Sequence, residues 1–234
     1  MVPHWLHWLA LASLGLGLVC LLIVAVDVAR HPQRMWIMSV VWPVVASFGT
    51  VLAVLAYFRW GRRTAADAPD DAPSTPFSVK VGTGTTHCGA GCTLGDICAE
   101  WLIFAVPGVL ALAGWPGFFS ERIFAVWVVA YVFAFAFGVA FQYFTIKPMR
   151  DLSPGRGLLE AVKADAASLT AWQFGMYGFM AIAHFWIFGT LIGTPLEVTM
   201  PEFWFMMQIA MIAGFLTSYP VNGWLIRTGI KEAM

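Results

Sequence analysis

The stretch that decides the fold is IFAVWVVAYVFAFAFGVAFQYF at residues 123–144, which runs for 22 residues without a charged side chain. About 20 apolar residues in helical form cross the hydrocarbon of a bilayer, and a helix satisfies its own backbone hydrogen bonds there. The whole chain has the same character, because 60% of its residues are hydrophobic and only 11% are charged. We therefore predict an all-α membrane protein.

Five further apolar runs are long enough to cross a membrane, so we predict a bundle of about six transmembrane helices. They lie at residues 5–28, 35–58, 94–112, 168–191 and 203–226. The first two form an N-terminal hairpin within residues 1–58, and the other four form a core within residues 81–234. Between these parts, residues 59–80 are rich in Pro, Ala and Asp, which predicts a solvated linker. Residues 153–167 carry charges at a helical spacing, as expected for a short helix on the membrane surface.

The distribution of Lys and Arg predicts the orientation, because basic residues of short loops stay on the cytoplasmic side. With six crossings, ten of the 13 basic residues fall on the side that holds both termini, and Arg30, Arg34 and Arg122 fall on the other. We therefore expect a multi-pass protein of the inner (plasma) membrane with both termini in the cytoplasm. The lipid bilayer is its expected partner, and a net charge of zero gives no indication of nucleic acid.

The run Thr-His-Cys-Gly-Ala-Gly-Cys-Thr-Leu-Gly-Asp at residues 86–96 carries the chemistry. Cys and His together select Cu(I), Zn(II) or related soft ions, whereas Mg(II) and Ca(II) call for oxygen ligands. The two glycines between the cysteines permit a loop or a close approach of the backbone to an ion. We predict a soft-metal site formed by His87, Cys88 and Cys92 at the cytoplasmic mouth of the third helix. Cys98 is near enough in the sequence to supply a third sulfur.

Polar residues beyond the motif indicate a route for such an ion. Asp96 and Glu100 are one helical turn apart, and carboxylates at membrane depth usually line a cavity or relay protons. Met176, Met180 and His184 follow at four-residue steps, so they share one helical face. Thioethers and an imidazole suit Cu(I), although methionines also serve simply to fill the core of a bundle.

Several stretches resemble a prokaryotic family of four-helix membrane proteins known only as a domain of unknown function. The resemblance covers about residues 81–234 and leaves the N-terminal hairpin outside. It implies a unit of four spans, with members sometimes associated with copper-related proteins, and it implies no defined activity. The stretches that carry it are the 86–96 run, residues 147–149, residues 163–170 and residues 219–232.

Three functions are compatible with these features. The first is a membrane protein that binds and transports Cu(I) or Zn(II). The second is a thiol redox enzyme or sensor in which Cys88 and Cys92 alternate between dithiol and disulfide, although their spacing exceeds the usual Cys-x-x-Cys by one residue. The third is an accessory or scaffold subunit that docks a membrane partner or a second copy of itself. The sequence has no nucleotide-binding loop and no nucleophile elbow, so a non-enzyme is favoured over an enzyme.

Overall fold

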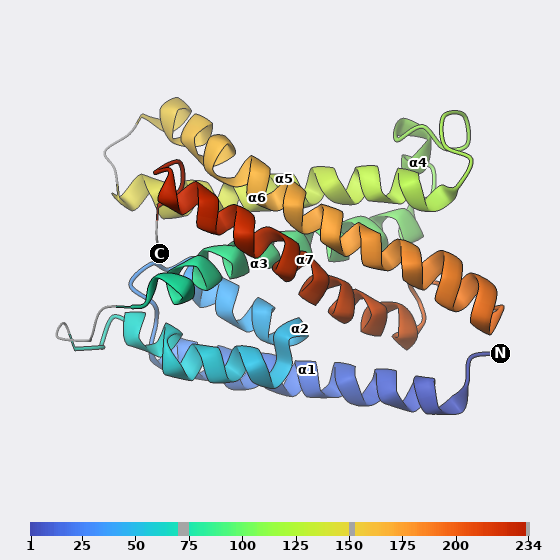
Figure 1. Cartoon of the computed structure of the whole chain (residues 1–234), viewed down its shortest axis with the longest axis horizontal. Coiled ribbons are helices and arrows are strands. Elements are labelled where there is room, and N and C mark those ends of the chain that lie inside the picture. The colour runs from blue at the N-terminus through green and yellow to red at the C-terminus, as the bar shows by residue number, and fades with distance from the viewer. Residues whose placement is uncertain (70–74, 150–152, 233–234) are drawn as a thin grey trace.

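The computed structural model describes residues 1–69, 75–149 and 153–232, without the side chains of 147–149. Within these ranges it has seven α-helices and no strand, which confirms the all-α class. Six helical segments are long and apolar enough to cross a membrane. The elements are α1 (His4–Arg30), α2 (Met38–Arg59), the 3-10 helix η1 (Gly61–Thr64), α3 (Phe77–Ala105), α4 (Val109–Leu112), α5 (Arg122–Met149), α6 (Pro154–Ala181), the π-helix η2 (Ile182–Ile192) and α7 (Pro201–Arg227), arranged as in Figure 1.

The second apolar segment, α2, is folded back on itself. Thr50 has φ 45° and ψ −130°, a backbone conformation that breaks the helix at its middle. The two halves lie side by side, because the rings of Trp42 and Tyr57 are 5.5 Å apart. Tyr57 also donates a hydrogen bond of 2.6 Å to Asp27 near the end of α1. Both ends of α2 therefore lie at the same end of the bundle, and α2 is a re-entrant segment (Figure 1).

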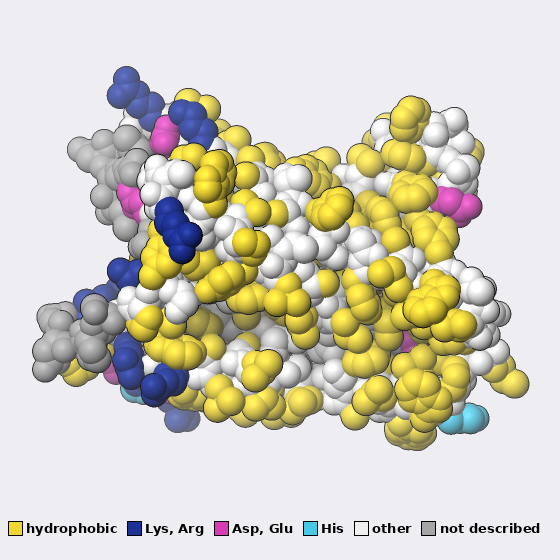
Figure 2. Space-filling view, viewed as in Figure 1, with side chains coloured by type: hydrophobic (Ala, Val, Ile, Leu, Met, Phe, Trp, Pro, Cys, Tyr) yellow, Lys and Arg dark blue, Asp and Glu magenta, His cyan; other side chains and the backbone are white. Residues whose placement is uncertain are grey.

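Because α2 re-enters, the N-terminus and the C-terminal tail lie at opposite ends of the bundle (Figure 1). The structure thus places at opposite ends of the bundle the two termini that the count of six crossings put on one side. Arg30 and Arg34, which the six-crossing count separated from the other basic residues, lie with them in the structure. Among the described Lys and Arg residues, only Arg122 at the start of α5 lies at the other end, and Figure 2 shows the basic side chains gathered at one end. Arg150 is outside the described residues.

The third helix begins at Phe77, well before the expected start at residue 94, and it ends at Ala105. The Cys motif therefore lies inside the helix and not in a loop at its mouth. Its glycines make close helix contacts: a Cβ on Gly91 would come within 2.9 Å of the backbone of Gly138 on α5, and one on Gly95 would collide with Ala134. Packing against α5 thus outweighs the poor helix propensity of glycine.

The helix α6 starts at Pro154 and includes the segment expected to lie on the membrane surface. That segment is not a separate surface helix, because Ala161 and Ala164 pack in a buried cluster with Val139 and Ile146 of α5. A helix of 28 residues is about 42 Å long, which exceeds the roughly 30 Å of hydrocarbon in a bilayer. The first turns of α6 therefore extend beyond the membrane core.

The described part of the 59–80 linker, which excludes residues 70–74, packs on the end of α1. Arg62 forms an ion pair with Asp27 at 3.1 Å. His31 makes a hydrogen bond of 2.6 Å to Asp67, and this bond holds the pKa of the Asp67 carboxyl below its usual value. The chain between α2 and α3 is therefore fastened to the basic end of the bundle.

The N-terminal segments dock on α7 through polar contacts at membrane depth. Gln208 of α7 donates a hydrogen bond of 2.8 Å to the carbonyl of Ser47 and accepts one of 2.8 Å from Ser13. Gly17 lies directly beside this point, where a Cβ would collide with the Ser47 carbonyl. The small size of Gly17 lets α1, α2 and α7 meet.

We expect Gly17→Leu to separate these three segments and lower the stability of the protein by about 1–3 kcal/mol, as overpacked sites usually do. Gly15→Leu is the matched control, because a Cβ at Gly15 has no neighbour within 4 Å. Thermal unfolding in detergent measures both. Equal effects of the two substitutions would contradict the docking described here.

We also expect epitope tags on the two termini to be accessible from opposite sides of the membrane. Protease treatment of sealed vesicles should remove one tag and spare the other, and the pattern should reverse in inverted vesicles. Removal of both tags from the same side would show that α2 crosses the membrane.

Candidate functional site

A fully buried polar cluster lies inside the basic end of the bundle. It consists of Cys88 from α3, Asp165 and Ser168 from α6, and Lys231 from the tail after α7, and each of these residues is at most 1% exposed. Charged groups away from water are costly unless they are paired and hydrogen-bonded. This buried group of polar residues is therefore a candidate functional site.

The tail after α7 is shaped so that Lys231 points back into the protein. The helix α7 ends at Arg227, and Gly229 follows with φ 71°, a left-handed conformation that favours glycine. The amide groups of Ile230 and Lys231 then donate to the carbonyl of Leu225 at 3.1 and 3.2 Å. This turn reverses the chain and brings the Lys231 side chain between α3 and α6.

The Lys231 ammonium is surrounded by acceptors. Its Nζ lies 3.2 Å from Asp165 Oδ1, 3.2 Å from Cys88 Sγ, 3.4 Å from Ser168 Oγ and 3.5 Å from the Gly84 carbonyl oxygen. The Cys88 thiol also donates to Asp165 Oδ1 at 3.0 Å. Burial alone would lower the pKa of Lys231, but the adjoining Cys88 sulfur and Asp165 carboxylate raise it above its ordinary value. Lys231 is therefore a charged counter-ion to Asp165.

The predicted metal ligands are not all brought together. Successive residues of a helix point about 100° apart, so His87 faces α5, where its Nε2 lies 3.5 Å from Thr145 Oγ1, while Cys88 faces α6. Cys92 is fully buried one turn beyond Cys88, and Cys98 is exposed. Among the described residues, no group of three His, Cys, Asp or Glu side chains is arranged to hold a metal ion.

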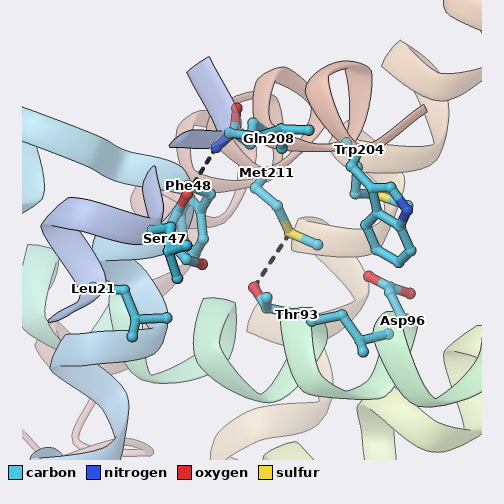
Figure 3. Close-up of a pocket in the computed structure, with 12 residues that line it drawn as sticks. Leu21, Ser47, Phe48, Thr93, Asp96, Trp204, Gln208 and Met211 are labelled. Carbon is cyan, nitrogen blue, oxygen red and sulfur yellow. Dashed lines mark hydrogen bonds between the residues drawn. The ribbon is translucent and has the colours of Figure 1, made fainter. Parts of the chain in front are cut away.

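The predicted route residues fall into two groups. Cys88, Cys92, Asp96 and Glu100 follow one another at four-residue steps, so they share one face of α3. Asp96 is 1% exposed, and neither of its carboxylate oxygens has a hydrogen-bond partner among the described residues. Figure 3 shows its carboxylate beside the indole of Trp204, on the wall of a cavity.

The second group surrounds a cavity of about 330 Å³ at the end opposite the basic cluster. Glu100, Met180 and His184 contribute to its lining. Glu100 and Met180 also line a narrow cavity of about 20 Å³ that reaches Asp96. Met176 is fully buried in the hydrophobic core. The structure therefore connects Glu100 to Asp96 through cavities, with His184 on the wall of the outer one.

Sequence reasoning missed Asp165, Ser168 and Lys231 as members of the site. In the sequence, Lys231 is one of the ten basic residues on the expected cytoplasmic side, and Asp165 lies within the expected surface helix at residues 153–167. A signal was present in α6, where Gly157, Ala161 and Ala164 form a small-residue face that continues to Asp165. Such a face predicts close packing of a helix, and an acid on it needs a buried partner.

The helices and the buried cluster define a multi-pass membrane protein with a polar site inside its bundle. The chain belongs to the family of a domain of unknown function, DUF4396, which matches residues 79–231. This agrees with the resemblance noted in the sequence and covers α3 to the tail that carries Lys231. No curated protein and no solved structure matches the chain.

We expect Lys231→Met to destabilise the protein by about 3–5 kcal/mol, because it leaves the Asp165 carboxylate buried without a counter-charge. Adding Asp165→Asn to this variant should restore most of the loss. Lys163→Met is the control, since Lys163 forms an exposed ion pair with Glu160, which is worth at most about 1 kcal/mol. Thermal unfolding in detergent measures all three, and a Lys231 effect no larger than that of Lys163 would contradict the buried pair.

Proposed function

We propose that the protein binds a soft metal ion, Cu(I) or Zn(II), inside its helix bundle and carries it across the membrane. The main observation in favour is that one face of α3 carries, at four-residue steps, the side chains of Cys88, Cys92, Asp96 and Glu100. Cys88, Cys92 and Asp96 are at most 1% exposed. Ionisable groups within a membrane are rare and usually mark an ion or proton pathway.

The sulfur-rich surroundings favour a soft ion over a hard one. Cys88 and Cys92 lie one turn apart, and Met207 and Met211 of α7 are also buried in the core that contains Cys92. Met211 Sδ is 3.6 Å from the hydroxyl of Thr93, next to Cys92. Thiolates and thioethers select Cu(I), and thiolates also bind Zn(II).

The cluster around Lys231 supplies groups that metal binding needs. A thiol must lose its proton to bind a metal, and the Cys88 thiol already donates to the Asp165 carboxylate. The Lys231 ammonium occupies the position in which an incoming cation would contact Cys88 and Asp165. An ion that binds at Cys88 therefore competes with Lys231 for the same acceptors.

We infer that the basic end of the bundle faces the cytoplasm, because Lys and Arg gather there (Figure 2). This orientation puts the C-terminal tail in the cytoplasm and the N-terminus on the other side of the inner membrane. Cys88 then lies nearer the cytoplasm, where thiols stay reduced. The cavity lined by Glu100 and His184 faces the opposite compartment.

The two alternative functions have less support in the geometry. Residues four apart on a helix have Cβ atoms about 5–6 Å apart, whereas a disulfide needs about 3.5–4.5 Å, so a Cys88–Cys92 disulfide would require α3 to unwind. For a scaffold role, the linker and hairpin would dock the partner, but they are engaged within the chain by contacts such as Arg62 with Asp27 and Ser47 with Gln208. A soft-metal role requires only that the sulfurs of Cys88 and Cys92, one turn apart on α3, reach one ion.

The full-length protein, purified without oxygen, should bind about one equivalent of Cu(I) or Zn(II) in a competition titration with a chromogenic chelator. We expect the combined substitutions Cys88→Ser and Cys92→Ser to weaken this binding at least tenfold, because the sulfur ligands are lost. Cys20→Ser is the matched control, since Cys20 is a buried cysteine of α1 outside the motif.

Normal binding by the double variant would overturn the proposal, as would the absence of binding by the wild-type protein. Cys92→Met serves as a second variant, because it keeps a sulfur on α3 and should retain part of the Cu(I) affinity while losing that for Zn(II). Elemental analysis of the same samples identifies the ion.

A further inference from the structure

A third cavity, of about 200 Å³, lies between the N-terminal segments and the core. Its wall is mostly apolar and includes Leu14 and Leu18 of α1 and Phe48 of α2. Leu18 is 57% exposed and Ile97 of α3 is 39% exposed, so the cavity lies at the flank of the bundle that faces lipid. Figure 3 shows that residues of α1, α2, α3 and α7 surround it.

One charged residue, Asp96, points into this cavity. Both of its carboxylate oxygens are buried and neither has a hydrogen-bond partner among the described residues. In Figure 3 the carboxylate lies beside the indole ring of Trp204. A buried carboxylate without partners is costly, so a group that pairs with it in this space would gain a large stabilisation.

The donors that line the cavity are already engaged elsewhere. The Thr93 hydroxyl donates to the Gly89 carbonyl at 2.8 Å, and the Trp204 indole N–H donates to the Val198 carbonyl at 2.8 Å. The amide N–H groups of Gln208 and the hydroxyl of Ser47 likewise donate to backbone carbonyls. A hydrogen-bond donor to the Asp96 carboxylate would therefore come from outside these side chains.

We propose that this cavity binds a small organic ammonium ion, with the ammonium group on the Asp96 carboxylate and an apolar chain against the leucines. A hard metal ion fits poorly, because it needs six or more oxygen ligands and this wall is mostly apolar. An alkylammonium satisfies the carboxylate, contacts the face or edge of Trp204 and fills the apolar part. At about 30 Å³ for each water-sized group, the volume suits a chain of about six carbons.

The site depends on the N-terminal segments. Leu14, Leu18, Ser47 and Phe48 lie outside residues 79–231, which the family match covers, whereas Asp96 lies within them. The segments before residue 79 therefore supply one wall of the cavity that holds an acid of the core. This site shares Asp96 with the proposed ion route but lies apart from Cys88, and its occupancy needs no metal.

The test uses the full chain in nanodiscs of zwitterionic lipid, without added metal, at pH 7. Hexylamine, hexanol and hexanoate share one chain and differ in the head group, and hexylamine is protonated at this pH. Isothermal titration, with the signal of empty nanodiscs subtracted, should show saturable binding of hexylamine at least tenfold tighter than that of hexanol, and no binding of hexanoate.

Asp96→Asn should weaken hexylamine binding at least tenfold. Leu18→Trp should do the same by filling the cavity while Asp96 is unchanged, so it covers the case in which Asp96→Asn fails to fold. Leu16→Trp is the matched control, because Leu16 is an exposed residue of α1 that does not line the cavity, and it should bind normally. Equal binding of the three probes, or unchanged binding by Leu18→Trp, would overturn the proposal.

Discussion

The close contact between α3 and α5 is the constraint on which the rest of the structure depends. Helices in lipid gain little from the hydrophobic effect when they associate, so their contact relies on small residues that let backbones approach. Gly91 against Gly138 and Gly95 against Ala134 supply this contact. It fixes the rotation of α3, and that rotation turns Cys88, Cys92 and Asp96 toward the interior and not toward lipid.

Once α3 has this rotation, the fold must compensate the charges it buries, and it does so differently at two depths. Near the basic end, Asp165 and Cys88 contact the ammonium of Lys231, which lies 66 residues after Asp165 and 143 residues after Cys88 in the chain. Near the middle of α3, Asp96 receives no partner from the described residues. Asp165 is thus neutralised by Lys231, whereas Asp96 is available to a ligand that enters the bundle. The first arrangement gives stability and the second gives a place for binding.

The sequence was sufficient for the helical class and for most of the apolar segments, because length and hydrophobicity alone decide whether a helix can cross a bilayer. Predictions from the sequence failed where tertiary contacts override the local conformational propensity of the residues. The glycines at 89 and 91 predict a loop by propensity, yet they are helical, and Trp172 and α5 pack against them. The fold at Thr50 had no local signal, since the apolar run continues through it. The pairing of Lys231 with Asp165 joins distant segments, which no spacing rule reveals.

The re-entrant course of α2 has a consequence for how the chain is divided between compartments. The family-matched part begins and ends at the basic end, so it keeps an even number of crossings whether or not anything precedes it. The N-terminal extension adds α1, which runs the length of the bundle, and α2, which starts and ends at the basic end. It therefore leaves both ends of the core in place and puts only the amino end at the other end of the bundle, so a domain fused there and one fused to the tail would be separated by the whole length of the helices.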